Sequence, residues 1–585
     1  MNRRSEVTSL NLRPRATQTD SARAARIFLE GSRTQALETG RTRLLVAGTV
    51  FALAFLAVGW RLIDISLLTQ GFEPRIAATP TAPQLETGRA DILDRNGVVL
   101  ATSLPTASLY ANPHQVRNPE DAAARLVRAL PEISATEVMA KLTTDRSFIW
   151  LKRHLTPRQH YAVNRLGIPG LYFQREQRRF YPHGRLTAHD IGFTDVDGRG
   201  LAGIEQSFDE VLRGSAEPLV LSLDLRVQHV LARELSAAMQ TFDAIGAAGI
   251  VMDAVSGEVL AMVSLPDFDP NRPATASPEA RFNRASLGVY EMGSVFKIFT
   301  LAMALDEGVV TLDDGYDASK PIRIARFTIN DFHPKNRWLS VPEIFMYSSN
   351  IGAARMAMDA GTAVQRAFLT RLGLTRPTSI ELAEVGRPMV PSPWRKINTL
   401  TIAYGHGLAV SPVHMASAVA AVVNGGELKP ATLIKPKSGV PAQGRRIMSR
   451  DTSLKMRQLM RLVVRHGTGR KAEARGYLVG GKTGTADKLI DGRYARDARI
   501  ASFVGAFPMN DPRYVVFAML DEPKGNESTH GYATGGWIAA PVVRRVVERI
   551  GPLLGVAPAT DAAGEDANER LLVRAKARAQ RIAAN

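Results

Sequence analysis

A serine and a lysine three residues apart form the pattern in this sequence with the clearest chemical potential. Ser294 and Lys297 open an apolar run that continues to Leu305. The length of this run and its alanine, leucine and methionine content predict a helix, so the i,i+3 spacing would place hydroxyl and amine on one face. The pair would then be a nucleophile beside a base. Taken alone, the four residues are more simply a serine helix cap and a snorkelling lysine.

A lysine that acts as a base must be neutral. The ordinary lysine pKa is near ~10.4, so Lys297 would carry a proton at neutral pH unless desolvation or a nearby cation lowered its pKa. The catalytic interpretation therefore requires that Lys297 be buried and have partners elsewhere in the chain.

Two further motifs follow in chain order. They are Ser348-Ser349-Asn350, just before a predicted amphipathic helix, and Lys482-Thr483-Gly484-Thr485, in a region of predicted strands. Alone, the first would be a helix N-cap and the second a turn with a surface lysine. Together with Ser294 and Lys297 they form the S-x-x-K, S-x-N and K-T-G set of penicillin-recognising serine enzymes.

The sequence resembles class B penicillin-binding proteins well beyond these motifs. Segments similar to the family's pedestal motifs are residues 91–97, 179–182 and 200–208. Segments similar to the division-specific branch, the peptidoglycan D,D-transpeptidases of the FtsI type, are residues 404–407, 411–412 and 424–426.

The resemblance implies a catalytic role for five residues. Ser294 would attack the penultimate D-Ala carbonyl of a stem peptide to form an acyl-enzyme, and Lys297 would take its proton. Ser348 would relay a proton toward the leaving amine. Asn350 would orient Lys297 and bind the substrate amide, and Lys482 would supply positive potential.

The remaining motif residues are implied to bind substrate. This set is Ser349, Thr483, Gly484 and Thr485, with the threonine hydroxyls on the substrate carboxylate. The backbone N–H groups of Ser294 and Thr485 would form an oxyanion hole, which contributes about 3 to 4 kcal/mol per donor in other enzymes. The resemblance implies acylation by β-lactams and no cofactor or metal.

Three further residues, Met292, His333 and His406, lie near the motifs in the sequence. Met292 stands where many relatives have proline, and His406 occupies the variable position of a Tyr-Gly-x-Gly stretch. Neither change removes a reacting group. His333 lies upstream of Ser348 and could line the cleft, although a lone histidine is more often structural.

The order of the predicted elements indicates how the motifs are positioned. Strand patterns occur early, at residues 248–252 and 258–264, and late, at residues 477–485, 500–507 and 514–520, with helices between and after them. Such an order predicts one sheet built from distant segments. Together with the resemblance, it predicts an α/β protein with the penicillin-binding transpeptidase fold over residues 218–555: an antiparallel sheet flanked by helices, plus an all-helical lobe.

The flanking regions predict a second domain and a tail. Residues 86–217 are expected to form a mixed α/β, non-catalytic pedestal with a type I′ hairpin at Asn96-Gly97 and a helical pattern over residues 119–166. Residues 556–585 are alanine-rich and charged, which predicts a C-terminal tail that is a frayed helix or disordered.

The N-terminal region predicts a membrane anchor. Residues 44–60 carry no charge, and with residues 61–63 they would reach roughly 25 to 30 Å as a helix. The arginine-rich residues 1–43 indicate a cytoplasmic tail, so residues 44–63 would be one transmembrane helix, followed by a linker at residues 64–85. A cleaved signal peptide fits less well, since no small-x-small site follows. A buried soluble helix is the other alternative.

Composition limits the function classes. The net charge of +18 suits an anionic membrane surface, a phosphate-bearing substrate or nucleic acid, and nucleic acid ranks last because no zinc-finger, helix-turn-helix or RNP-like motif is present. The absence of cysteine excludes disulfides and thiol catalysis.

The resemblance also implies partners and a location. These are peptidoglycan stem peptides, β-lactams, the bacterial inner membrane at the septum with the catalytic domain in the periplasm, and divisome membrane proteins including a lipid II-polymerising glycosyltransferase. Two alternatives stay open. One is a carboxypeptidase or β-lactamase-type hydrolase, which needs a water-activating base that the sequence does not place. The other is an idle scaffold, against which the intact motifs argue.

Overall fold

The structure, a computed structural model, describes residues 45–60, 88–324, 327–436, 443–490, 493–559 and 565–584. Its two compact units are Met1–Gln84 and Leu85–Asn585. In the first unit, residues 45–60 are helical with exposed side chains, while the predicted tail, the linker and the ends of the predicted anchor lie outside the described residues. No helix among the described residues has the length and apolarity needed to cross a membrane.

A five-stranded antiparallel sheet forms the centre of the second unit. Its strands, in spatial order, are β16 (Gly480–Ile490), β17 (Arg493–Phe507), β18 (Tyr514–Asp521), β6 (Gly246–Asp253) and β7 (Val259–Leu265). Early and late segments of the chain therefore share one sheet, as the order of the strand patterns predicts. Strand β16, which carries the K-T-G motif, lies at an edge.

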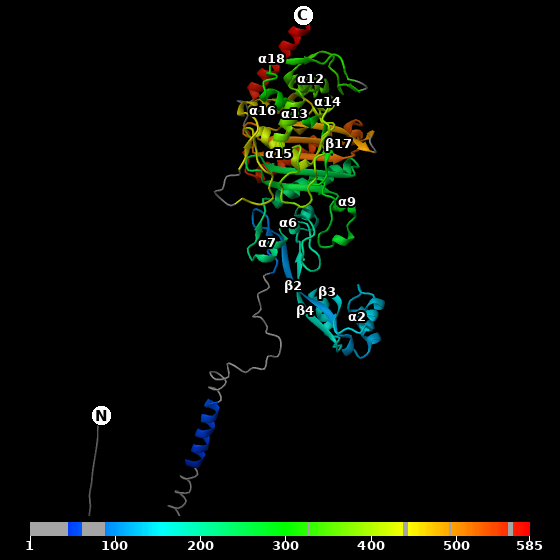
Figure 1. Cartoon of the computed structure of the whole chain (residues 1–585), viewed down its shortest axis with the longest axis vertical. Helices are drawn as coiled ribbons and strands as arrows, with labels where there is room; N and C mark the ends of the chain where they lie inside the picture. The colour runs from blue at the N-terminus through cyan, green and yellow to red at the C-terminus, as the bar shows by residue number, and fades with distance from the viewer. Residues whose placement is uncertain are drawn as a thin grey trace, which may run out of the picture. The chain divides into compact units, whose positions relative to one another are not determined.

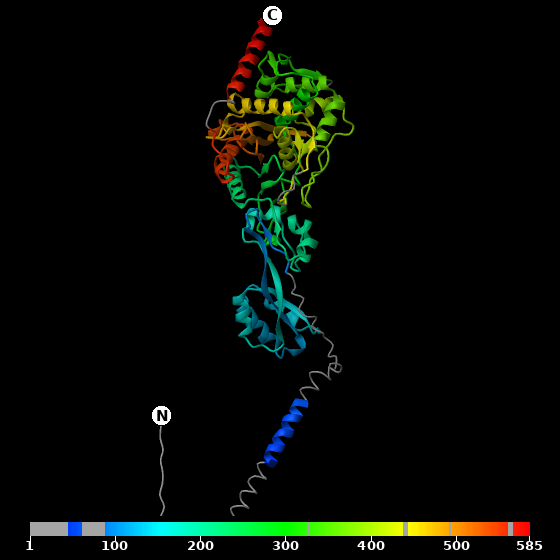
Figure 2. The same ribbon diagram turned by 90° about the vertical axis from the view of Figure 1, so that its left-hand side faces the viewer.

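Both faces of this sheet are buried, and alternate residues serve different cores. On β18, Val515, Phe517 and Met519 join one apolar cluster, whereas Val516 and Leu520 join another. The period of two in a strand explains this division. Helices lie on both faces (Figure 1 and Figure 2). With the first cluster lie α10 (Lys297–Asp306), α15 (Pro412–Val423) and α16 (Arg450–His466), and with the second α8 (Leu225–Thr241) and α17 (Ala539–Leu553).

A mainly helical lobe carries the S-x-N motif. Its helices are α11 (Val341–Met346), α12 (Asn350–Ala360), α13 (Thr362–Arg371) and α14 (Lys396–Ile402). The lobe is not all helical, because two small antiparallel sheets accompany the helices. They pair β9 (Gly315–Asp317) with β12 (Trp338–Ser340), and β10 (Ile322–Ile324) with β11 (Phe327–Ile329).

The pedestal is built around one long strand. Strand β2 (Val99–Ala111) pairs with β1 (Ile92–Leu93), β3 (Ile149–Leu155) and β4 (Leu171–Phe180), and β5 (Leu219–Val220) lies parallel to β1. Figure 2 shows helices beside these long strands. These are α2 (Pro119–Ala129), α3 (Ala135–Leu142) and α4 (Pro157–Asn164).

Two details of the predicted pedestal are wrong. The hairpin at Asn96-Gly97 is not type I′, because of these two residues only Gly97, at φ 86°, has a positive φ. The turn from Asp94 to Gly97 closes through a Gly97 N to Asp94 O hydrogen bond of 3.1 Å, with glycine supplying the left-handed position. The helical pattern over residues 119–166 is interrupted by β3, which pairs with β2.

The C-terminal segment also differs from the prediction of a tail. Residues Glu565–Ala584 form helix α18. Leu571 and Leu572 of this helix are buried against Met346 of α11 and Leu462 of α16. The segment is thus helical, one of the two predicted alternatives, and its Leu571 and Leu572 are packed.

Candidate active site

The predicted nucleophile and base lie side by side. Ser294 is in a 3₁₀ turn (Gly293–Phe296), Lys297 is the first residue of α10, and Ser294 Oγ lies 2.9 Å from Lys297 Nζ. Gly293, at φ 53°, packs so tightly that a Cβ there would lie 2.3 Å from Thr485 O. Glycine therefore permits both the backbone conformation and the close approach of the Ser294 turn to β16.

The Lys297 amine is the point at which the motifs meet. It lies 2.7 Å from the Ser348 carbonyl oxygen, 3.0 Å from Ser348 Oγ and 2.7 Å from Asn350 Oδ1. Its residue is fully buried, at 0% exposure. The predicted burial of Lys297 and the predicted proximity of Ser294, Ser348 and Asn350 are both present in the structure.

The surroundings of Lys297 favour a neutral amine. Burial lowers the pKa of Lys297 well below its usual value, the neighbouring Lys482 cation lowers this pKa further, and the Asp331 carboxylate opposes both effects. Burial also lowers the pKa of Lys482, to about 7. Two lysine amines in one small site repel each other when both are charged. The lowered pKa values therefore favour a neutral Lys297, which can act as a base, beside a Lys482 that can be protonated.

Ser348 connects the two lysines. Its hydroxyl oxygen lies 3.0 Å from Lys297 Nζ and 3.0 Å from Lys482 Nζ. The residue has φ 61°, a left-handed conformation that is uncommon for serine. Such strain at a residue between two amines is the kind that tertiary structure maintains at functional sites.

Ser349 differs from its predicted role. It is 2% exposed and caps α12: its hydroxyl accepts from Gly352 N at 3.0 Å and donates to Asp331 Oδ2 at 2.8 Å. Asp331 Oδ1 also accepts from Ile351 N at 2.9 Å. This geometry makes Ser349 a positioning residue, and not one that faces substrate. No motif pointed to Asp331; only its sequence position upstream of Ser348 could have suggested it.

The K-T-G strand presents its residues beside the Ser294 turn. Lys482 Nζ donates to Thr483 O and Oγ1 at 3.2 and 3.3 Å, and the Thr483 hydroxyl pairs with Thr468 at 2.8 Å. Thr485 Oγ1 accepts from Gly535 N at 3.1 Å. A Cβ on Gly484 would lie 2.5 Å from Met292 O, so this glycine lets the strand approach the nucleophile turn.

The other sequence candidates lie outside this cluster. His333 is exposed and its ring contacts Phe332. His406 Nδ1 lies 3.0 Å from Glu291 Oε2, and Tyr494 donates to the same oxygen at 3.1 Å. The variable position of the Tyr-Gly-x-Gly stretch thus contacts the strand just before Ser294, a link that the sequence did not reveal.

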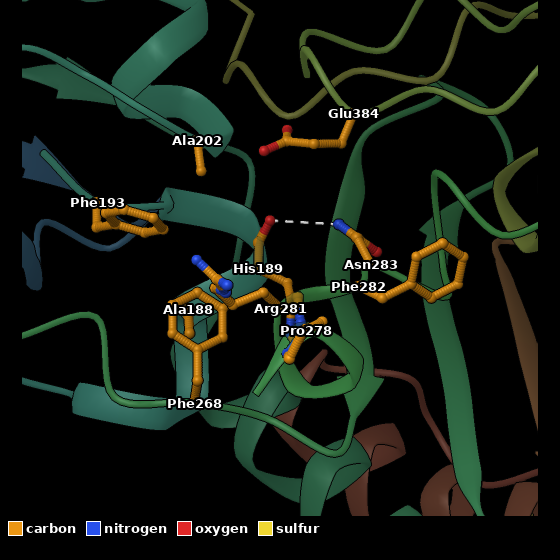
Figure 3. Close-up of a pocket in the computed structure, with 10 residues that line it drawn as sticks. All are labelled: Ala188, His189, Phe193, Ala202, Phe268, Pro278, Arg281, Phe282, Asn283 and Glu384. Atoms are coloured by element: carbon orange, nitrogen blue, oxygen red, sulfur yellow. Dashed lines mark hydrogen bonds between the residues drawn. The ribbon is translucent and has the colours of Figure 1, made fainter. Parts of the chain in front are cut away.

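A separate cavity of about 350 Å³ lies between residues of the pedestal and of the domain that follows it, and no residue of the three motifs lines it. Figure 3 shows the apolar side chains of Phe193 and Phe268 on one side of the cavity, with Asn283 and Glu384 on the other. Asn283 Nδ2 donates to the His189 carbonyl at 3.3 Å across this boundary. This cavity is therefore separate from the cluster around Ser294.

Comparison with known families gives two matches. The family described as "Penicillin binding protein transpeptidase domain" matches residues 247–548, and "Penicillin-binding Protein dimerisation domain" matches residues 84–224.

Curated proteins and solved structures give concordant similarities. A probable peptidoglycan D,D-transpeptidase FtsI of Caulobacter vibrioides is 42% identical over 82% of this chain and 84% of its own length. The peptidoglycan D,D-transpeptidase FtsI of Escherichia coli is 30% identical over 88% and 92%. A Mycobacterium tuberculosis penicillin-binding protein 3 complexed with ampicillin superposes with a TM-score of 0.65 at 25% identity, covering 81% of this chain and 97% of that one.

Proposed function

The chain belongs to the class B penicillin-binding proteins, and from that membership we propose that Ser294 carries out peptidoglycan D,D-transpeptidation. The donor is a stem peptide that ends in D-Ala-D-Ala. The observation that carries the proposal is the position of Lys297, a fully buried amine within 3.0 Å of Ser294 Oγ, Ser348 Oγ and Asn350 Oδ1.

The first half-reaction forms an acyl-enzyme. Neutral Lys297 accepts the hydroxyl proton as Ser294 Oγ bonds to the penultimate D-Ala carbonyl carbon. The C–N bond then breaks, and the terminal D-Ala leaves with a proton relayed through Ser348, whose hydroxyl lies between Lys297 and Lys482. Lys482 and the Thr483 and Thr485 hydroxyls hold the donor carboxylate, and the Ser294 and Thr485 N–H groups stabilise the oxyanion.

The second half-reaction forms the cross-link. The amine of a neighbouring stem peptide attacks the ester carbon, loses a proton to the site and releases Ser294. A β-lactam follows the first half-reaction and stops at the acyl-enzyme. Two carboxylates near the site, Glu291 and Asp331, are each engaged by donors, which favours transfer to an amine over base-assisted hydrolysis.

The location forms part of the same proposal. Residues 44–63 anchor the chain in the bacterial inner membrane with residues 1–43 in the cytoplasm, and the catalytic domain works in the periplasm at the division septum. Exposed apolar side chains on the described helix support the anchor; Phe51 and Phe55 are 67% and 75% exposed. Divisome membrane proteins, including a lipid II-polymerising glycosyltransferase, are the proposed partners.

The reaction can be tested with a synthetic stem pentapeptide and a labelled D-amino acid as the acceptor. The full chain should release D-Ala and incorporate the label, and the Lys297→Ala variant should do neither. Release of D-Ala without incorporation would support the hydrolase. No release by a folded wild-type chain would support the idle scaffold.

A further inference from the structure

Helix α18 contacts the short helix that leads into the catalytic Ser348. Leu571 and Leu572, at 9% and 4% exposure, share an apolar cluster with Met346 and Leu462, and Tyr347 packs against it. Met346 is the last residue of α11, two positions before Ser348. The C-terminal helix therefore supports one end of the segment that presents the Ser348 hydroxyl.

Polar contacts from α18 reach the other end of α11. Arg574 pairs with Asp313 at 3.1 Å, and Arg578 lies 3.8 Å from Asp314. The Asp314 carbonyl in turn accepts from Val341 N, the first residue of α11, at 2.8 Å. Exposed ion pairs contribute little stability, but here they add to the apolar contact and define the direction of the helix.

A third contact connects α18 to the helix before the K-T-G strand. Glu569 Oε1 lies 2.7 Å from His466 Nε2 at the end of α16. Arg461 of α16 donates to Val479 O at 2.8 Å, just before β16 begins. Helix α18 thus contacts both α11, which leads to Ser348, and α16, which contacts the start of the Lys482 strand. The Ser348 Oγ and Lys482 Nζ atoms are 3.0 Å apart.

We propose that α18 is an intramolecular positioning element that holds α11 so that Ser348 keeps its strained place between the two lysines. This inference rests on the proposed acyl-enzyme function. Ser348 has φ 61°, a conformation that the surrounding packing must maintain. Loss of α18 should lower the acylation rate constant more than the affinity for the ligand, because α18 packs directly on the end of α11 beside Ser348 but reaches the carboxylate-binding strand β16 only through α16.

The first test compares the full chain with a chain that ends at residue 559, using a fluorescent penicillin at several concentrations. The acylation rate constant should fall about tenfold or more, with the dissociation constant of the initial complex little changed, because small misplacements of a catalytic group cost this much. A synthetic peptide of residues 560–585, added in excess, should restore the rate in a saturable manner.

Point variants keep the test valid if the shortened chain folds poorly. Leu572→Asp places a charge in the buried contact and should slow acylation, whereas Leu572→Met should retain it. Val573→Asp is the matched control, because Val573 is on the same helix and 64% exposed.

The outcomes separate the two proposals. Wild-type acylation rates in both the shortened chain and Leu572→Asp would overturn the role of α18 and leave the transpeptidase assignment standing. A slow shortened chain that the peptide does not restore, together with a wild-type rate in Leu572→Asp, would overturn it too. Absence of labelling in the folded full chain would instead remove the acyl-enzyme function.

Discussion

Two buried lysines and one strained serine determine the chemistry at the scale of residues. Lys297 and Lys482 are both at 0% exposure, and each lies 3.0 Å from Ser348 Oγ. Burial penalises charge on either amine, and the charge of one penalises charge on the other. The pair therefore favours a single proton near neutral pH, and in the proposed mechanism Ser348 provides the path along which this proton moves.

This arrangement predicts a bell-shaped pH profile for acylation. Lys297 acts only when neutral, so the rate should rise as pH rises through its lowered pKa. Lys482 acts only when charged, so the rate should fall as pH rises past its pKa of about 7, or somewhat higher once a substrate carboxylate is bound. The measurement is the second-order acylation constant between pH 5 and 10. A constant that rises only near the ordinary lysine value, ~10.4, would contradict the account.

Asp331 should tune the same profile. Its negative charge opposes the lowering of the Lys297 pKa, so Asp331→Asn should move the acidic limb to lower pH. Asp331→Ala also removes two hydrogen bonds at the start of α12, which should cost about 1 to 3 kcal/mol of stability and slow acylation. Denaturant unfolding and the pH profile measure these effects. Asp145→Ala, at a fully exposed carboxylate, is the control that should change neither.

At the scale of elements, the site depends on a tight approach between the Ser294 turn and its neighbours. Gly405, at φ 92°, would place a Cβ only 1.9 Å from the Gly293 carbonyl oxygen. Gly308 also has a left-handed backbone, at φ 68°, but a Cβ on Gly308 would have no atom within 4 Å. Alanine variants of the two glycines therefore distinguish the effect of backbone strain, which both share, from the effect of a clash with the Ser294 turn, which only Gly405→Ala has.

The Gly405→Ala and Gly308→Ala variants should behave differently. Both should lose about 1 to 2 kcal/mol of stability from the left-handed backbone, and Gly405→Ala should lose more, because its Cβ would lie 1.9 Å from the Gly293 carbonyl oxygen. Only Gly405→Ala should also slow acylation, by about tenfold or more, because the clash displaces the turn that carries Ser294. Thermal unfolding and penicillin labelling measure the two effects. Equal labelling rates in both variants would show that the turn tolerates the displacement.

The sequence predicts some of these elements better than others. Strand periodicity predicts that β6 and β16 belong to one sheet, and motif order predicts that Ser294, Ser348 and Lys482 lie close together. Asp331 could not be found this way, because a carboxylate in a loop carries no pattern before the fold brings it to Ser349. A helix was one of the two alternatives for the C-terminal segment, but the packing of α18 was not predicted, because the two leucines that join the apolar cluster, Leu571 and Leu572, lie in an alanine-rich charged segment.

At the scale of the whole molecule, buried polar contacts hold the pedestal and join it to the transpeptidase domain. Glu205 is at 0% exposure and accepts from Arg179 Nε at 2.6 Å and from Arg89. Across the boundary, Glu384 accepts from Gly203 N at 3.0 Å. The pedestal motifs of the sequence therefore stabilise the pedestal and its contact with the catalytic domain.

Breaking the Glu205 cluster should destabilise this support strongly. Glu205→Gln leaves the buried Arg179 guanidinium without its carboxylate, whereas Arg89 keeps its ion pair with Asp209, and the loss should cost about 3 to 5 kcal/mol. Glu210→Gln, at an exposed position nearby, should cost almost nothing. The two variants can be compared by urea unfolding monitored by tryptophan fluorescence. Equal unfolding midpoints for Glu205→Gln and Glu210→Gln would mean that the cluster does not stabilise the pedestal.

The most direct test of the central claim is the intact mass of the full chain after incubation with benzylpenicillin, with wild type beside Ser294→Ala. We expect one persistent adduct of the mass of penicillin on the wild type and none on the variant. An adduct on Ser294→Ala, or none on a folded wild-type chain, would contradict it.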